Sequence, residues 1–488
     1  MGAEQSTPRA PPAMDEKTSS AYAQQRQHDK QLLASLERLN LNEQGNADLQ
    51  RDILDKYEQE FWSDQKNVLA MNAIMANDPT DVLVNPANAL KNNHVFNVQL
   101  DLEGTVTNQK QSGRCWLFAG TNVLRLAVID KYKLKDDFEL SQNYLFFYDK
   151  LEKANWFLEN MIDLADKDVS DRVVQFLLQD PVGDGGQWAM FSSLVDKYGV
   201  VPKSVYPETV ASSSSSKLGW LVTVKLREFA IQIRKAVAEG VSINSIRVLK
   251  QDMMKDIHRI MVIFLGEPPK SFDWEATDKN GKFVTVRNTT PKKFFKEVVG
   301  YKLEDTLSLI NDPRNAYNKL YTVDRLGNVV GGHPVQYINV DISIMKHLAI
   351  KVLKSGKPVW FGCDVTKFLD RKYATMDTNI HNYELAFNVD FKMDKKDRIL
   401  YGESAMTHAM VFTGVHLGDD GKALRWRVEN SWGDSSGDKG YYIMQDDWFT
   451  EYVYQLVLEK NVVPQHLVDL LKTDPAVLPP YDPMGTLA

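Results

Sequence analysis

Apolar residues along this chain of 488 residues change their spacing roughly two thirds of the way through. Up to about residue 265 they recur mostly every three or four positions, which is typical of amphipathic helices. The clearest such stripe consists of Leu226, Phe229, Ile233 and Val237. From Val335 onward, short runs rich in β-branched and aromatic residues predominate, and these favour strands. A largely helical half followed by a half of strands predicts an α+β fold.

Two stretches near the N-terminus place their apolar residues on one helical face, residues 32–39 and 49–61, and we expect both faces to pack on later parts of the chain. The preceding residues 1–27 are rich in Pro, Ser, Gln and Ala, so we expect a disordered tail. A helix is predicted over residues 141–152, with Ser141 as its N-cap. Strands are predicted at residues 358–363, 409–415, 423–429, 440–444 and 452–459.

The composition limits the kinds of chemistry to consider. The net charge is −7 and there are two cysteines, Cys115 and Cys363. Without a secretory signal peptide, this favours a reducing compartment, and we expect a cytoplasmic location. Paired Cys-x-x-Cys and His-Glu-x-x-His motifs do not occur, so we expect no metal and no other cofactor. The longest apolar runs are too short to cross a bilayer, so no stable membrane insertion is expected.

A polar stretch that contains a glycine, residues 109–114, runs into the apolar residues 116–119, with Cys115 at the junction. This pattern predicts a buried helix with Cys115 on or just before its first turn. Unpaired N–H groups and the helix dipole at such an N-terminus favour a thiolate. Gln109 precedes the cysteine by six positions, so its amide would be able to stabilise an oxyanion beside the sulfur.

A nucleophilic cysteine needs a base and a group that orients the base. His408 stands at the start of an apolar strand and Asn430 at the end of another. His408 would accept the thiol proton and pass one to the leaving amine. The side-chain oxygen of Asn430 would hold the imidazole in position, and Trp432 would shield that hydrogen bond from water. Alone, His408 is more simply a core histidine and Asn430 a turn residue; their order after the cysteine favours catalysis.

The sequence Gly-Asp-Gly-Gly at residues 183–186 predicts a tight loop. Phosphate binding is one interpretation, but Gly-x-Gly-x-x-Gly is absent and no strand is predicted before the loop. A glycine pair also lets a substrate backbone approach closely and pair with it as a strand does. We favour this second use and predict that Gly185 and Gly186 bind substrate.

Together these residues resemble the papain-like cysteine peptidases. The matching motifs are Gln109, Gly113-x-Cys115-Trp116, the glycine pair, His408-Ala409 and residues 430–433. His408 follows Cys115 by 293 positions (408 − 115), against about 130–150 in papain-like enzymes, so a large insertion is implied. Longer matching segments, residues 108–119, 139–155, 309–314 and 406–410, resemble the bleomycin hydrolase family from about residue 50 to the C-terminus.

This resemblance implies a papain-like two-lobe fold with a large helical insertion and an active-site cleft between a helical lobe and a β-barrel lobe. The residues would be divided into a tail (1–27), an N-terminal extension and helical lobe with the nucleophile (28–204), a mostly helical insertion (205–345), a β-barrel lobe with the histidine and asparagine (346–478) and a C-terminal arm in the cleft (479–488). The arm would bring a carboxylate at Ala488 to the α-amino group of a substrate. Gln109 and the backbone N–H of Cys115 would form the oxyanion hole.

The predicted function is therefore a cytosolic, cofactor-free cysteine aminopeptidase that removes N-terminal amino acids from peptides and related amides through a Cys115 thioester. The resemblance also implies homocysteine thiolactone as a substrate and a homohexamer as the assembly. Residues 217–259 carry nine Lys and Arg against four Asp and Glu. They form either a solvated helix face or a basic channel wall that binds DNA weakly. The alternative functions are a papain-like endopeptidase, whose arm does not block the cleft, and a nucleic-acid-binding scaffold with the same fold.

Overall fold

The computed structural model describes residues 48–90 and 93–488, and the chain divides into two compact units, residues 1–76 and 77–488. The described part of the first unit contains α2 (Arg51–Ser63) and α3 (Gln65–Ala76). The helix predicted from the pattern at 49–61 is thus confirmed. No residue of α2 or α3 is buried, so the packing partner of that face stays a prediction. The predicted tail at 1–27 and the pattern at 32–39 lie outside the described residues.

Two central helices of the second unit carry the residues around the cysteine. α6 (Cys115–Tyr132) begins at Cys115, as predicted, and is buried on most of its sides because its first turns are apolar all around. α7 (Gln142–Asp163) begins after its predicted N-cap, Ser141, whose Oγ accepts the Tyr144 backbone N–H at 3.0 Å. The neighbouring short elements are α4 (Pro79–Leu83), α5 (Pro86–Ala89), β1 (Val98–Gln99), α8 (Arg172–Gln179), α9 (Trp188–Tyr198) and α10 (Val210–Ser213).

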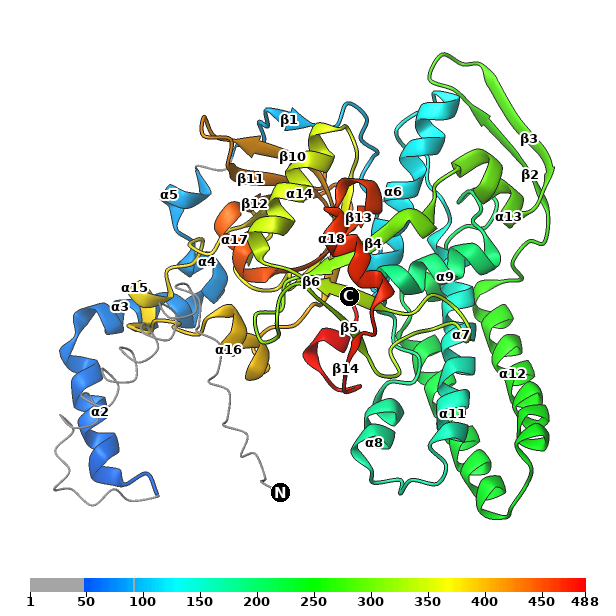
Figure 1. The fold of residues 1–488 in the computed structure, drawn as a ribbon. Helices are drawn as coiled ribbons and strands as arrows, with labels where there is room; N and C mark the ends of the chain where they lie inside the picture. The colour runs from blue at the N-terminus through cyan, green and yellow to red at the C-terminus, as the bar shows by residue number, and fades with distance from the viewer. Residues whose placement is uncertain (1–47, 91–92) are drawn as a thin grey trace, which may run out of the picture. The chain divides into compact units, whose positions relative to one another are not determined.

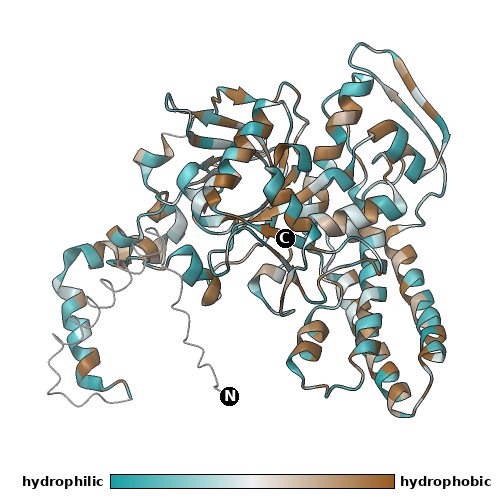
Figure 2. Ribbon diagram, viewed as in Figure 1, coloured by the Kyte–Doolittle hydropathy of each residue, from teal (hydrophilic) through white to brown (hydrophobic). Residues whose placement is uncertain are grey.

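Two long helices, α11 (Ser216–Ala238) and α12 (Ile243–Leu265), run side by side and pack against α7 (Figure 1). Their residues alternate between apolar and polar along the helices (Figure 2). The predicted stripe accounts for the packing, since Leu226, Phe229 and Ile233 are buried. Within the described residues, no helix combines the length and the apolar character needed to cross a membrane.

The predicted insertion, residues 205–345, is not helical throughout. It contains the hairpin β2 (Phe272–Thr277) and β3 (Phe283–Thr289), which turns at Gly281 with φ of +85°. Three further strands, β4 (Thr306–Ile310), β5 (Lys319–Val323) and β6 (Gln336–Asn339), belong to the large sheet. The sheet therefore begins about forty residues before the predicted boundary at 345, because these strands pair with β13 and β14 from the end of the chain.

The large sheet is mixed and has the order β14-β5-β6-β4-β13-β7-β10-β11-β12-β9-β8, with β1 paired to β10. The five strands predicted from alternation and apolar runs are all present. They are β7 (Val359–Cys363), β10 (His408–Leu417), β11 (Ala423–Glu429), β12 (Tyr441–Gln445) and β13 (Val453–Glu459). The remaining strands are β8 (Leu369–Asp370), β9 (Thr375–Met376) and β14 (Ala476–Leu478).

Strand β10 lies at the centre of the sheet and is covered on both faces. Val411 belongs to the apolar core that includes α6, whereas the next residue, Phe412, belongs to the core that includes α14 (Ile342–Lys354) and α17 (Asp446–Tyr452). This alternation follows from the two-residue repeat of a strand. Cys363 is fully buried in the second core, as expected for a small core residue. The strand that starts with His408 thus packs directly against the helix that starts with Cys115.

Candidate active site

Two loops that are far apart in the sequence pair with each other to assemble the site. The backbone N–H of Gln109 donates to the Ser431 carbonyl at 2.8 Å, and that of Gly433 donates to the Thr107 carbonyl at 3.0 Å. These bonds join the loop before α6 to the loop after β11. The motif around the cysteine and the motif around the asparagine are therefore held together by backbone geometry.

The thiol of Cys115 lies next to the start of β10. The sulfur accepts a hydrogen bond from the backbone N–H of Ala409, the residue that follows His408. Burial raises the pKa of Cys115 to about 11, although the N–H groups of Ala409, Trp116 and Cys115 itself act in the opposite direction. The N–H groups at the start of α6 thus favour the thiolate, as expected, but burial opposes them and has the larger effect on the pKa. Cys115 is only 2% exposed, and burial of the charge outweighs the helix dipole.

The imidazole of His408 is held by Asn430. Nε2 of His408 lies 2.9 Å from Oδ1 of Asn430, and the same oxygen accepts the Ser431 backbone N–H at 2.7 Å. Because a backbone N–H only donates, this atom of Asn430 is the oxygen, and Nε2 carries the hydrogen. Burial, and to a smaller extent the charge of Arg371, lower the pKa of His408 to about 4, against the opposing effect of the hydrogen bond that Nε2 donates to Asn430. The neutral ring therefore keeps a lone pair on Nδ1.

Trp432 and Gln109 complete the surroundings of the predicted trio. The rings of Trp432 and His408 are 5.1 Å apart between centroids and tilted by 33°, so the indole lies next to the imidazole; that it shields the hydrogen bond to Asn430 stays a prediction. The Gln109 side chain accepts from Ser431 Oγ at 2.6 Å and donates from Nε2 to the Ser112 carbonyl at 2.7 Å. An amide nitrogen carries two hydrogens, so a second N–H of Gln109 remains for an oxyanion.

The end of the chain pairs with the glycine loop. The Gly186 backbone N–H donates to the Ala488 carbonyl oxygen at 3.0 Å, and the Ala488 N–H donates to the Gly186 carbonyl at 3.3 Å. A Cβ on Gly185 would lie 2.8 Å from Cβ of Leu487, and one on Gly186 would lie 2.4 Å from Cε2 of Trp116. Both glycines are thus required by close packing, one against the arm and the other against the residue next to Cys115.

The chain matches the model of the Peptidase C1-like family over residues 48–485. It belongs to that family. It is 48% identical to aminopeptidase C of Lactobacillus delbrueckii subsp. lactis, over 80% of this chain and 88% of that protein, and 43% identical to bleomycin hydrolase of Homo sapiens, over 88% and 96%. The crystal structure of PepW from Lactobacillus rhamnosis is similar with a TM-score of 0.89 and 46% identity, over 91% and 100% of the two chains. The chain is therefore a cysteine peptidase with a papain-like α+β fold.

In this cysteine peptidase, two buried lysines of α7 hold the glycine loop. Lys153 donates from Nζ to the carbonyls of Gly183 and Gly185 at 2.7 and 2.6 Å, and Lys150 forms an ion pair of 2.6 Å with Asp184. Burial alone would raise the pKa of Asp184, but Lys150 and several hydrogen bonds hold it well below its usual range. The loop that pairs with the arm is therefore fixed from behind by α7.

Sequence reasoning assigned no role to Lys150, Lys153 or Asp184. The available signal was a pair of opposite charges four positions apart, Asp149 and Lys153, directly after the apolar and aromatic residues 144–148. Both are buried in the structure, 2.8 Å apart. A charged pair on the inner face of a core helix indicates a partner that the helix itself does not supply.

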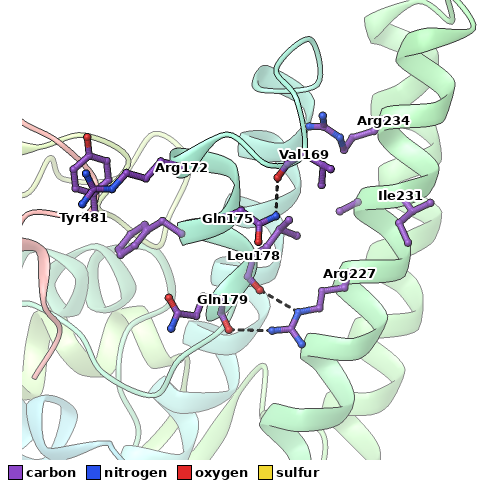
Figure 3. Close-up of a pocket in the computed structure, with 11 residues that line it drawn as sticks. Val169, Arg172, Gln175, Leu178, Gln179, Arg227, Ile231, Arg234 and Tyr481 are labelled. Carbon is purple, nitrogen blue, oxygen red and sulfur yellow. Dashed lines mark hydrogen bonds between the residues drawn. The ribbon is translucent and has the colours of Figure 1, made fainter. Parts of the chain in front are cut away.

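The C-terminal arm is also anchored away from Gly186. Nη2 of Arg314 lies 2.7 Å from Oδ1 of Asp482 and 2.9 Å from Oδ2 of Asp312. Arg314 and Asp482 are only 10% and 12% exposed, so solvent screens this ion pair weakly. The guanidinium of Arg172 lies 3.5 Å from the ring centroid of Tyr481 (Figure 3). The arm is thus fixed by charge and stacking several residues before it reaches the glycine loop.

A cavity of about 770 Å³ lies between α8 and α11 and extends to Tyr481 of the arm (Figure 3). Arg227 donates to the carbonyls of Leu178 and Gln179 at 3.0 Å each, and Arg172 stacks on Tyr481. These guanidinium groups therefore join α8 to α11 and to the arm. The residues that line this cavity are distinct from those around Cys115.

Proposed function

We propose that this chain is a cysteine aminopeptidase, like the relatives named aminopeptidase C and bleomycin hydrolase, in which Cys115, His408 and Asn430 are the catalytic trio. Burial of both groups favours a neutral thiol and a neutral imidazole at rest. Proton transfer from Cys115 to Nδ1 of His408 accordingly accompanies attack of the sulfur on the substrate carbonyl. Asn430 keeps the proton on Nε2 and the ring in plane throughout.

The reaction then proceeds by acyl transfer. The sulfur bonds to the carbonyl carbon, and the oxyanion accepts the Cys115 backbone N–H and the second N–H of Gln109. The carbon–nitrogen bond breaks as His408 gives its acquired proton to the leaving amine. Water then attacks the thioester, with His408 again taking a proton, and releases the amino acid with the thiol restored. No metal or cofactor is required at any of these steps.

The single observation that supports removal of N-terminal residues is the pairing of Ala488 with Gly186. The arm occupies the backbone positions that a longer substrate would need on this side of Cys115. A carboxylate at Ala488 would also pair with the α-amino group of a substrate. A substrate with a free amine is then bound, and one with a blocked amine or an N-terminal extension is excluded.

Hydrolysis of an aminoacyl fluorogenic amide, compared with its N-acetylated twin, tests this proposal. The intact chain is expected to cleave the free-amine substrate at least about 100-fold more efficiently, because acetylation removes the charge and adds bulk next to the arm. A variant that lacks residues 486–488 is expected to lose most of this preference while still cleaving amides. Equal cleavage of both substrates by the intact chain would refute the role of the arm and favour the alternative of an endopeptidase.

The ion pair between Arg314 and Asp482 leads to a separate prediction. Asp482→Asn is expected to raise cleavage of the N-acetylated amide relative to the free-amine amide about tenfold, because loss of a charge-assisted hydrogen bond loosens the arm. The ratio of the two kcat/KM values is the measurement. Glu459→Gln is the matched control, since Glu459 pairs at 2.6 Å with Lys357, which is 54% exposed. An unchanged ratio in Asp482→Asn would show that the arm is held without this pair.

The nucleic-acid-binding alternative is less favoured by the basic helices. Among the nine Lys and Arg of residues 217–259, Arg247 and Lys250 pair with Glu159, and Arg227 and Arg234 bind backbone carbonyls. Several others pair with acidic residues three or four positions away. We retain weak DNA binding, a homohexamer, homocysteine thiolactone as a substrate and a cytoplasmic location as predictions from the family resemblance. Both cysteines are free and buried, which supports the proposed cytoplasmic location.

A further inference from the structure

Arg371 is an exposed cation whose charge acts on His408. It stands in the turn between β8 and β9, and its guanidinium carbon lies 4.7 Å from the centroid of the Trp432 ring. Over residues 48–90 and 93–488, no acidic side chain forms an ion pair with it. The next residue, Lys372, does have such a partner, Asp81, at 3.7 Å. The charge of Arg371 is therefore available to a ligand at Trp432.

In the proposed function the arm lies on the N-terminal side of the substrate, where Ala488 pairs with Gly186. The leaving group then departs on the other side of the scissile bond. In the proposed function His408 protonates the leaving amine, and its ring is 5.1 Å from that of Trp432. Since Trp432 is next to His408 and Arg371 is next to Trp432, we expect the peptide beyond the scissile bond to pass near these three side chains.

The distances match a short leaving peptide. The separations of 5.1 and 4.7 Å place the guanidinium of Arg371 within about 10 Å of the His408 ring. This is an upper limit, and an extended residue spans roughly 3.3–3.6 Å, so one or two residues and the hydrogen bond between carboxylate and guanidinium cover the distance. Arginine binds a carboxylate through two parallel hydrogen bonds, and stacking on an indole holds its plane. Burial is the main cause that lowers the pKa of His408, and the charge of Arg371 lowers it further, so this charge already acts on the site.

We infer that Arg371 recognises a carboxylate on the departing part of the substrate, one or two residues beyond the scissile bond. The carboxylate belongs either to the C-terminus of a dipeptide or tripeptide or to an Asp or Glu side chain at that position. The inference rests on the proposed function, because it needs His408 to face the leaving amine. With a carboxylate of the arm at one end and Arg371 at the other, the site is complementary to short peptides that carry charges at both termini.

Cleavage of Ala-Ala-Ala and of its C-terminal amide, both with a free amine, tests the inference. The unaltered enzyme is expected to prefer the acid over the amide about tenfold in kcat/KM, mainly through KM. Arg371→Gln is expected to reduce the ratio to about one, and Arg371→Lys to keep part of it. Because the charge also acts on His408, the ratio within each variant is compared instead of the absolute rate. The preference should also fall as salt is added.

A second pair of substrates, Ala-Asp-Ala-amide and Ala-Asn-Ala-amide, separates the two sources of the carboxylate. A preference for the Asp peptide that is lost in Arg371→Gln assigns recognition to side chains as well as C-termini. Lys372→Gln is the matched control, and both ratios should stay unchanged in it. Ratios near one in the unaltered enzyme, or ratios that survive in Arg371→Gln, would overturn the inference. Failure of the unaltered enzyme to cleave any aminoacyl amide would instead refute the proposed function.

Discussion

Replacing Cys115 with alanine is expected to lower kcat/KM for an aminoacyl amide by roughly 10⁵-fold, because no other group is placed to form the thioester. The only other cysteine of the chain, Cys363, is fully buried in the core on the α14 face of the sheet. His408→Ala should cause a loss of similar size, since the nucleophile and its base act as one unit. Initial rates with a fluorogenic amide, normalised to the folded fraction, provide the measurement.

Cys363→Ala is the matched control for this experiment. It also removes a buried thiol, but it should cost only stability and leave kcat/KM within about threefold of the unaltered enzyme. The fold should survive Cys115→Ala, because only one sulfur atom is removed at the end of α6. Activity of Cys115→Ala above about 1% of the unaltered enzyme, with the control behaving as expected, would assign the nucleophile elsewhere.

The largest stability effect is expected from the buried ion pair behind the site. Arg125 lies on α6, and Glu429 immediately precedes Asn430; their side chains are 1% and 2% exposed and 2.6 Å apart. Arg125→Met should lower the free energy of unfolding by about 3–5 kcal/mol, because it leaves Glu429 buried without its charge partner. The double variant Arg125→Met/Glu429→Gln should recover much of this loss, since no ionisable group then remains buried. Urea denaturation of the three proteins tests both expectations.

The decrease in the free energy of unfolding caused by Arg125→Met should depend on pH in a definite direction. Burial raises the pKa of Glu429 to about 7, against the opposing effect of Arg125, and without Arg125 the pKa should rise further. The folded state then binds more protons than the unfolded state above pH 4.5, so the free energy of unfolding falls as pH rises. Arg125→Met should therefore be more destabilising at pH 8 than at pH 5.

Arg247→Gln is the control for an exposed pair. Arg247 pairs with Glu159 and is 54% exposed, so its replacement should cost less than about 1 kcal/mol at either pH. A loss of the same size at both pH values in Arg125→Met would show that Glu429 does not titrate in this range.

Local pattern alone was sufficient for most elements near the site. The start of α6 at Cys115, the cap of α7 at Ser141 and the bounds of β11 follow from residue spacing, capping chemistry and strand alternation. The candidates Cys115, His408 and Asn430 also stand in short, specific motifs. These features depend on a few neighbouring residues, and so they are visible along the chain without knowledge of the fold.

How burial and long-range pairing act on these residues depends on the folded arrangement. Helix position predicts a lowered pKa for Cys115, but packing against β10 buries the thiol and raises it. Arg314 and Asp482 meet although 168 positions separate them, and Arg371 reaches Trp432 from a different turn of the sheet. Residue order along the chain is enough to say which groups are present and which elements carry them. Their electrostatic state and partners follow from the fold, because desolvation and contact depend on every element packed around a residue.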